Sequence, residues 1–235
     1  MTTAADLRRE LEKRSDAERA VFHKRYFKTG PGDYGEGDRF RGVKVPVLRQ
    51  LSREHQDMPT SEVVKLLRSQ FHEDRLLALV ILVRQFDRGD HVRKSAIYAL
   101  YMKSTRYINN WDMVDCSAPN IVGAHLRERS RAPIRRLARS ANIWERRIAV
   151  LATFHFIRGG EFDESLHIAK RLLTDEEDLI HKAVGWMLRE IGSRDQEVLE
   201  KFLRVNYRKM PRTMLRYAIE RFPEARRQRY LKGSV

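Results

Sequence analysis

The segment INNWDMVDCSAPN at 108–120 places a tryptophan and an aspartate, Trp111 and Asp115, four residues apart. An indole can stack on a ligand, and a carboxylate can stabilise positive charge in one. The chain carries a formal net charge of +15, so its expected partner is a polyanion, and a carboxylate near that partner needs an explanation. The structural alternative is that Asp112 or Asp115 caps a helix, the usual role of an aspartate at a helix start.

Two other aromatic side chains are candidates for a binding surface. Trp186 and Tyr26, together with Trp111, could form aromatic walls in a groove that is otherwise basic, where a base or a sugar would stack. Packing inside the protein is the commoner fate of a tryptophan. We expect that fate for Trp144, which opens a periodic run.

Metal and phosphate-loop chemistry have little support in the sequence. The eight histidines are scattered without ligand-like spacing and the chain has one cysteine, so we expect no metal site and no cofactor. The segment GPGDYGEGD at 30–38 lacks the lysine and hydroxyl residue of a phosphate-binding loop, follows no strand and carries three acidic residues. We expect a structured loop between helices there.

The positive charge is concentrated in two segments. Residues 127–147 hold eight arginines against two glutamates, and residues 201–232 hold eleven basic residues against two acidic ones. Solvated helix faces would explain any single charge. Two such clusters favour a polyanionic partner: nucleic acid first, then an anionic membrane or an acidic protein.

No feature of the sequence indicates a membrane or secreted protein. The longest apolar run, Leu76–Val83, is too short to span a bilayer, and the N-terminal residues lack the apolar segment of a secretory signal. The single Cys116 cannot form an internal disulfide, which fits a reducing cytosol.

Apolar residues recur at three- and four-residue spacing along most of the chain, and no segment alternates strictly enough to predict a strand. This pattern predicts an all-α fold of short helices. The periodic runs are 7–27, 47–51, 63–67, 76–86, 97–102, 148–157, 166–173, 179–191, 198–205 and 214–222.

A repeat underlies these helices. Four of them can be aligned on a small central residue, which we call the anchor of the helix. The anchors are Ala78, Ala149, Ala183 and Ala218, and the distances between them along the chain are 71, 34 and 35 residues. The first step is about twice the others, which places a missing repeat near Val114. A period in the mid-thirties with two helices per unit is typical of a curved HEAT- or TPR-like α-helical solenoid.

We therefore expect one domain over residues 1–235. Its first part, 1–58, would hold N-terminal helices and the Gly-rich loop, and 59–232 would hold helical pairs.

Basic residues stand one to three positions before the anchors: Arg75, Arg146, Arg147, Lys182 and Arg216. Stacked repeats would align these residues into a positive stripe along a concave groove, which suits the regularly spaced phosphates of a duplex. The alternative, that they are ordinary charges on helix surfaces, has equal weight.

Four blocks of the sequence, in order, resemble the AlkD-type alkylpurine DNA glycosylases. They are RYFKTGPGDYGEGDRFRGVKVPVLRQL at 25–51, NNWDMVD at 109–115, WERRIAVLATFHFI at 144–157 and KAVGWMLRE at 182–190. The resemblance implies HEAT-like repeats that wrap duplex DNA and the removal of N3- and N7-alkylated purines. It also implies a functional cluster formed by Trp111, Asp115, Trp186, Arg147 and Tyr26. Arg146, beside Arg147, and Arg189, in the last block, are further candidates for contact with DNA.

The resemblance also implies a role for the carboxylate. An N3- or N7-alkylated purine is positively charged and leaves as a neutral base, so it needs little protonation. Asp115 would then stabilise the oxocarbenium-like sugar and position the attacking water. Trp111 and Trp186 would bracket the cationic nucleotide, and Arg147 would hold a backbone phosphate.

Two other functions remain open at this point. A non-catalytic solenoid that binds duplex DNA would use Asp115 only as a helix cap, and a HEAT-type scaffold for protein or RNA would spread its basic residues over several faces. Nothing identifies a lysine nucleophile, so the leading hypothesis is a monofunctional glycosylase. We expect a monomer without an obligate protein partner.

Overall fold

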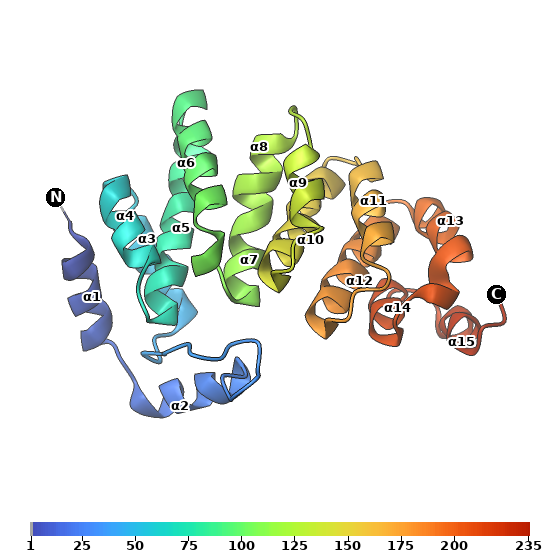
Figure 1. Cartoon of the computed structure of the whole chain (residues 1–235), viewed down its shortest axis with the longest axis horizontal. Helices are drawn as coiled ribbons and strands as arrows, with labels where there is room; N and C mark the ends of the chain where they lie inside the picture. Colours follow the sequence, from blue (N-terminus) through green and yellow to red (C-terminus); the bar gives the residue numbers. More distant parts are fainter. Residues whose placement is uncertain (1) are drawn as a thin grey trace. The chain divides into compact units, whose positions relative to one another are not determined.

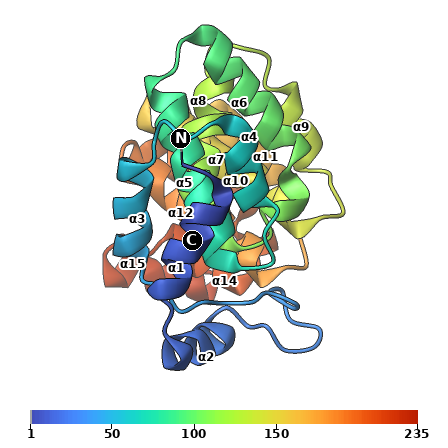
Figure 2. The same ribbon diagram turned by 90° about the vertical axis from the view of Figure 1, so that its left-hand side faces the viewer.

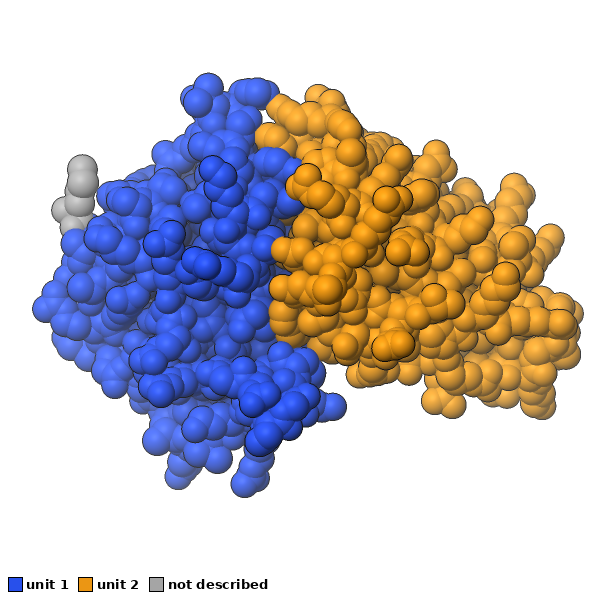
Figure 3. Space-filling model, viewed as in Figure 1, with its two compact units in different colours: residues 1–121 blue, residues 122–235 orange. Residues whose placement is uncertain are grey.

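The computed structural model describes residues 2–235, and over these residues the all-α prediction is confirmed. The only β-type pairing in that range is an isolated bridge between Arg39 and Phe71. The chain divides into two compact units, Met1–Ile121 (unit 1) and Val122–Val235 (unit 2), which Figure 3 shows in different colours. Each unit is described by itself below.

Unit 1 is built around one long helix, α5 (His72–Arg88), which packs against four other helices of the unit. The apolar run Leu76–Val83 lies on α5, and Leu77, Leu79 and Ile81 are fully buried. This run therefore forms the core of the unit. The elements of unit 1 in Figure 1 are α1 (Ala4–Lys13), α2 (Ala17–Tyr26), α3 (Val45–Glu54), α4 (Thr60–Leu67), α5, α6 (His91–Lys103), the 3-10 helix η1 (Thr105–Tyr107) and α7 (Trp111–Ala118).

The periodic run 7–27 forms two helices, α1 and α2, because the chain turns at residues 14–16. Asp16 caps α2 by accepting a hydrogen bond from the backbone N–H of Arg19, and its own N–H donates to the carbonyl of Arg41. Gly42 has a φ of +77°, and a Cβ there would lie 2.1 Å from the carbonyl oxygen of Asp16. A glycine is therefore required where the end of the loop meets the start of α2.

The Gly-rich segment forms a loop between helices, as predicted from its composition. In Figures 1 and 2, α2 and this loop, residues 27–44, lie beyond the ends of α1, α3 and α5. No residue of α2 is buried, and this distinguishes it from the helices of the core. The loop and α2 bring Tyr26 toward the start of α7.

Unit 2 has a series of helices that pack on one another in chain order: α10 (Ile143–Arg158) on α12 (Asp178–Gly192), and α12 on α14 (Arg212–Ala218). A Cβ at Gly185 of α12 would lie 2.5 Å from the carbonyl oxygen of Met214, so α12 and α14 approach closely at that glycine. The other elements are the π-helix η2 (Pro119–Gly123), at the boundary of the units, α8 (Ala124–Leu126), α9 (Ala132–Leu137), α11 (Asp163–Arg171), α13 (Gln196–Asn206), the 3-10 helix η3 (Tyr207–Lys209) and α15 (Glu224–Lys232).

All the predicted repeat anchors are buried. Ala78, Ala149 and Ala183 have no exposed surface and Ala218 has 1%, and Val114, the anchor of the missing repeat, is fully buried on α7. Each anchor lies on α5, α7, α10, α12 or α14, as expected for the inner residue of a repeated helix. The continuous solenoid remains a prediction.

Among residues 2–235, no helix combines the length and the apolar character needed to cross a membrane.

Candidate active site

Helix α7 begins at Trp111 and carries Asp115 one turn later on the same face. Its N-cap is Asn110, whose side-chain oxygen accepts a hydrogen bond from the N–H of Trp111 at 2.8 Å. Asp112 accepts from the N–H of Met113 at 2.8 Å. Asp115 lies in the middle of the helix, where it cannot cap the helix start, and its side chain is half-buried.

The side chains around Asp115 show the effect of its charge. Burial raises the pKa of the Tyr101 hydroxyl, and the carboxylate of Asp115 adds to the rise. Burial also raises the pKa of the Cys116 thiol, and the carboxylates of Asp112 and Asp115 raise it further. The thiol therefore stays protonated at neutral pH and is a poor nucleophile.

An aromatic cluster lines the start of α7. The ring of Trp111 stacks on Phe27 with centroids 5.4 Å apart, and Tyr26 meets Trp111 edge-on at 6.0 Å. Tyr26 also stacks on Phe22 at 6.0 Å, and these two side chains are 54% and 61% exposed. The structure thus brings Tyr26 and Trp111 together and adds Phe22 on the solvent side.

A cavity of about 330 Å³ opens beside this cluster. Apolar and aromatic side chains dominate its wall, and the acidic and imidazole groups are those of Asp112, Glu73, His72 and His23. The lining residues are Phe22, His23, Tyr26, Phe27, Val43, Val45, Leu48, His72, Glu73, Leu76, Trp111 and Asp112.

A buried polar network lies beneath the cavity. His72, at the start of α5, is 2% exposed and has Asp38 on one ring nitrogen (3.2 Å) and Asp112 on the other (2.8 Å). Burial alone would lower the pKa of His72, but the carboxylates of Asp112 and Asp38 outweigh it and raise the pKa to about 9. Burial alone would raise the pKa of Asp38, but the hydrogen bond from His72 and the charge of Arg75 bring it below its usual range.

Arg75 belongs to this network and does not lie on the surface. It is 4% exposed, and its guanidinium donates to Asp38 at 2.6 Å and to the carbonyl of Ser69 at 3.0 Å. Arg75 therefore serves the buried network, and its expected contact with DNA stays a prediction. The alignment located its helix correctly but could not give the direction of the side chain.

The two adjacent arginines of α10 are both held by protein groups. Arg147 is 5% exposed and donates to the carbonyl of Leu179 at 2.7 Å. The Nε of Arg146 lies 2.7 Å from a carboxylate oxygen of Asp175, and its guanidinium donates to the carbonyl of Ser140 at 3.0 Å. Neither side chain is freely exposed, so the predicted basic stripe is weakened at two further positions.

Helix α12 carries three predicted site residues at positions that share a face. Trp186 is half-buried, donates to Glu190 at 3.3 Å and lies against Phe154 with ring centroids 5.8 Å apart. Lys182 pairs with Asp178 at 2.7 Å, and Arg189 pairs with Glu220.

On α14, Arg216 is exposed and forms no ion pair with any residue in the range 2–235. Trp144, expected in the core, is 6% exposed.

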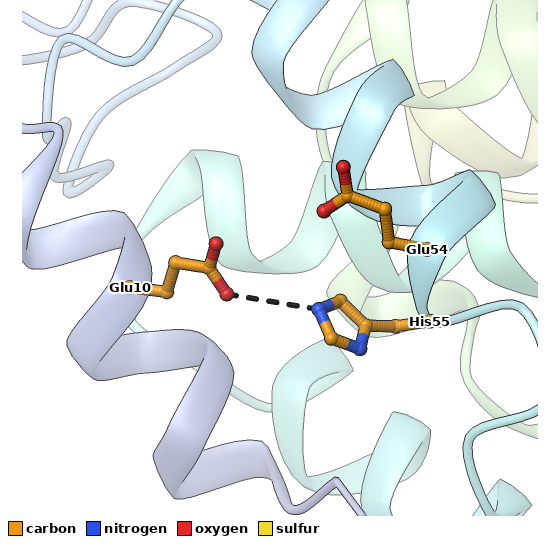
Figure 4. Close-up of side chains that lie close together, drawn as sticks. All are labelled: Glu10, Glu54 and His55. Atoms are coloured by element: carbon orange, nitrogen blue, oxygen red, sulfur yellow. Dashed lines mark ion pairs between the residues drawn. The ribbon is translucent and has the colours of Figure 1, made fainter.

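One cluster of acidic and histidine side chains could hold a metal ion. Figure 4 shows Glu10 of α1 directed toward His55, at the end of α3, with Glu54 beside them. One potential ligand atom of each lies within 4.8 Å of the others, a proximity that residues 44 positions apart could not reveal in the sequence. Glu10 also pairs with Arg14 at 2.6 Å and Glu54 accepts from Gln50 at 2.8 Å, so an ion would have to displace these partners.

A family model described as DNA alkylation repair enzyme matches residues 7–222. The chain belongs to this family. The structure is similar to that of a predicted DNA alkylation repair enzyme from Enterococcus faecalis, with 17% identity, a TM-score of 0.68, and coverage of 90% of this chain and 98% of the other. A comparison with curated proteins gives no match. At this identity the structural similarity supports the fold only, while the family match confirms the resemblance seen in the four sequence blocks.

In this member of the family, six of the predicted residues form two groups. Tyr26, Trp111 and Asp115 gather in unit 1, and Lys182, Trp186 and Arg189 share α12 in unit 2. The sequence interpretation missed Phe22 and the buried network of Asp38, His72 and Asp112. Phe22 had a signal, because it stands one helical turn before Tyr26. His72 had none, because a lone histidine at a helix start is usually unremarkable.

Proposed function

We propose that the protein is a monofunctional DNA glycosylase that releases cationic N3- or N7-alkylated purines from duplex DNA. Membership of the DNA alkylation repair family supports the substrate class. The observation that carries the proposal is the arrangement on α7, where Trp111 and Asp115 share a face and Asn110 takes the capping role. Because Asp115 does not cap the helix start, its carboxylate can face a cationic substrate one helical turn from the indole of Trp111.

The chemistry requires one carboxylate. Ordinary glycosidases use a second carboxyl group to protonate the leaving oxygen. An alkylated purine already carries a positive charge and departs as a neutral base, so that acid is unnecessary. Water attacks C1′ of the deoxyribose, the electrons of the N-glycosidic bond leave with the base, and Asp115 takes up the water proton and passes it to solvent. Before that, the Asp115 carboxylate stabilises the oxocarbenium-like sugar.

The aromatic side chains would recognise the substrate charge. Trp111 offers a ring face to a cationic base, and Tyr26 and Phe22 extend the apolar surface beside it. For unit 2 we propose that Trp186 contributes a second aromatic contact and that Lys182, Arg189 and Arg216 contribute phosphate contacts. Arg147 could reach a phosphate only through the guanidinium donors left after its bond to the carbonyl of Leu179.

The direct test is release of free base from methylated duplex DNA by the wild type and by Asp115→Asn. We expect the substitution to reduce release by about 10²-fold or more, because the transition-state charge loses its stabiliser. Binding to unmodified duplex should stay equal or tighten, because a negative charge is removed near the phosphates. Trp186→Ala and Arg147→Gln in the same assay test the residues of unit 2.

Two results would contradict this proposal. A wild type that binds duplex DNA but releases no alkylpurine would be a non-catalytic member of the family. Equal release by the wild type and Asp115→Asn would mean that a residue other than Asp115 stabilises the transition state.

A further inference from the structure

His72 stands between two carboxylates that come from different parts of unit 1. Its Nδ1 faces Asp38 of the loop at 3.2 Å, and its Nε2 faces Asp112 of α7 at 2.8 Å. An ionised carboxylate only accepts hydrogen bonds, so both ring nitrogens must donate, and an imidazole that donates from both nitrogens is a cation. The geometry alone therefore indicates an imidazolium that bridges the loop to α7.

The carboxylate of Asp38 extends this bridge to the first residues of α7. It accepts hydrogen bonds from Arg75 at 2.6 Å, from Asn110 at 3.3 Å and from Asn109 at 3.4 Å. Asn110 is the N-cap of α7. The start of α7 is thus held twice, through Asn110 by Asp38 and through Asp112 by His72.

The histidine ring also supports the indole of the proposed site. It lies 4.7 Å from the ring of Phe40 and 4.7 Å from that of Phe27, measured between centroids. Phe27 in turn stacks on Trp111 at 5.4 Å. A shift of the histidine would therefore pass through one ring to the indole.

We propose that His72 is a positioning residue of the glycosylase site: a buried cationic bridge that fixes the start of α7, orients Trp111 and Asp115, and neutralises Asp112 so that Asp115 is the carboxylate of α7 that serves the nucleotide. This role rests on the proposed function. A buried ion network is weak evidence of stability, because apolar residues of similar volume could replace it. The effect that apolar residues could not supply is orientation, because the ion network fixes the direction of the side chains that it joins.

The bridge makes the site sensitive to alkaline pH. The pKa of His72 is raised to about 9 from an ordinary value of 6.5, so the folded protein keeps a proton that the unfolded chain loses. The stabilising effect of this proton is complete below about pH 6.5 and is lost as the pH rises through about 9. Deprotonation would leave the carboxylates of Asp38 and Asp112 without their shared partner.

The other charged groups near the bridge are engaged elsewhere. Glu73, the next residue of α5, accepts from the backbone N–H groups of Arg41 and Gly42 and lies 3.5 Å from His23 of α2. Arg75 acts on the bridge only through Asp38. The pH response in the alkaline range is therefore assigned to His72.

The first experiment is ¹⁵N NMR of the histidine side chains in the full-length wild type between pH 6 and 10. We expect one imidazole to stay doubly protonated up to about pH 9, and His72→Gln identifies it by loss of the signal. A neutral His72 at pH 7.5 would overturn the proposal. This readout requires no catalytic activity, so it tests the bridge even if the wild type releases no base.

The second experiment uses Asp112→Asn, which keeps the shape of the side chain but removes its charge. We expect release of N7-methylguanine to fall about tenfold, with binding to unmodified duplex unchanged. The alkaline decline in activity should move to lower pH, because His72 loses one of its two carboxylates. The indole N–H resonance of Trp111, assigned with Trp111→Phe, should also shift.

Asp87→Asn is the matched control, because Asp87 is exposed on the same helix as His72 and forms no ion pair with any residue in the described chain. It should leave release, pH profile and indole resonance unchanged. A purely structural role for the network would lower the thermal stability of Asp112→Asn but leave its pH profile and rate unchanged below the melting temperature. That outcome, or an unshifted Trp111 resonance, would overturn the positioning role.

Discussion

Arg75 and Arg216 occupy comparable places before their helix anchors, but their surroundings differ. Arg75 is 4% exposed and bound by Asp38, whereas Arg216 is exposed and has no ion-pair partner among residues 2–235. A buried guanidinium compensates a buried carboxylate, and an exposed one can replace counterions on a phosphate. The same residue type thus serves the fold in one case and is available for a ligand in the other.

This difference predicts opposite effects of two matched substitutions. Arg75→Gln should lower the free energy of unfolding by about 3–5 kcal/mol, because Asp38 loses its closest cationic partner. It should leave the salt dependence of duplex binding unchanged. Arg216→Gln should leave stability unchanged and reduce the slope of log K against log salt by about 0.9. Denaturant titration and fluorescence anisotropy measure the two quantities, and a reversal of the pattern would contradict this assignment.

At the scale of elements, spacing predicted the helices well and their contacts poorly. Periodicity located the helices of the core, and the buried anchors Ala78, Val114 and Ala149 confirm the aligned faces. The break between α1 and α2 was missed because apolar spacing continues through a turn held by Asp16. The network of His72 was missed because its members are 34 and 40 residues away in the chain, and single-chain periodicity carries no information on such pairs.

The packing of α12 on α14 predicts a sensitive glycine. In Gly185→Ala the new Cβ would meet the carbonyl oxygen of Met214 at 2.5 Å, and backbone cannot move aside easily. We expect a loss of about 1–3 kcal/mol of unfolding free energy, measured by denaturant titration. Gly159→Ala, just after α10 in the same unit, is the control, because its Cβ would meet the end of the exposed Arg127 side chain at 3.0 Å. If both variants were equally stable, the close approach of these helices would be wrong.

For the whole molecule, the four ordered sequence blocks predicted the family correctly, and the family match covers residues 7–222. Composition predicted a basic protein, but it could not separate charges that hold the fold from those available to a ligand. Arg146, Arg147 and Arg189 all have protein partners. The net charge of +15 therefore does not show which basic side chains would meet a duplex.

The absence of buried residues in α2 has a consequence for how ligand binding would be detected. A helix held by few buried contacts opens locally at low free-energy cost, so its amides should exchange with deuterium much faster than those of α5. A nucleotide seated on Phe22 and Tyr26 would cover this helix. We expect methylated duplex to slow exchange across residues 17–26 while α5 is unchanged, as measured by mass spectrometry. Unchanged amide exchange in α2 would exclude this helix from the binding surface. Slowed exchange would place it on that surface, and the exchange rate of α2 would then report whether the site is occupied.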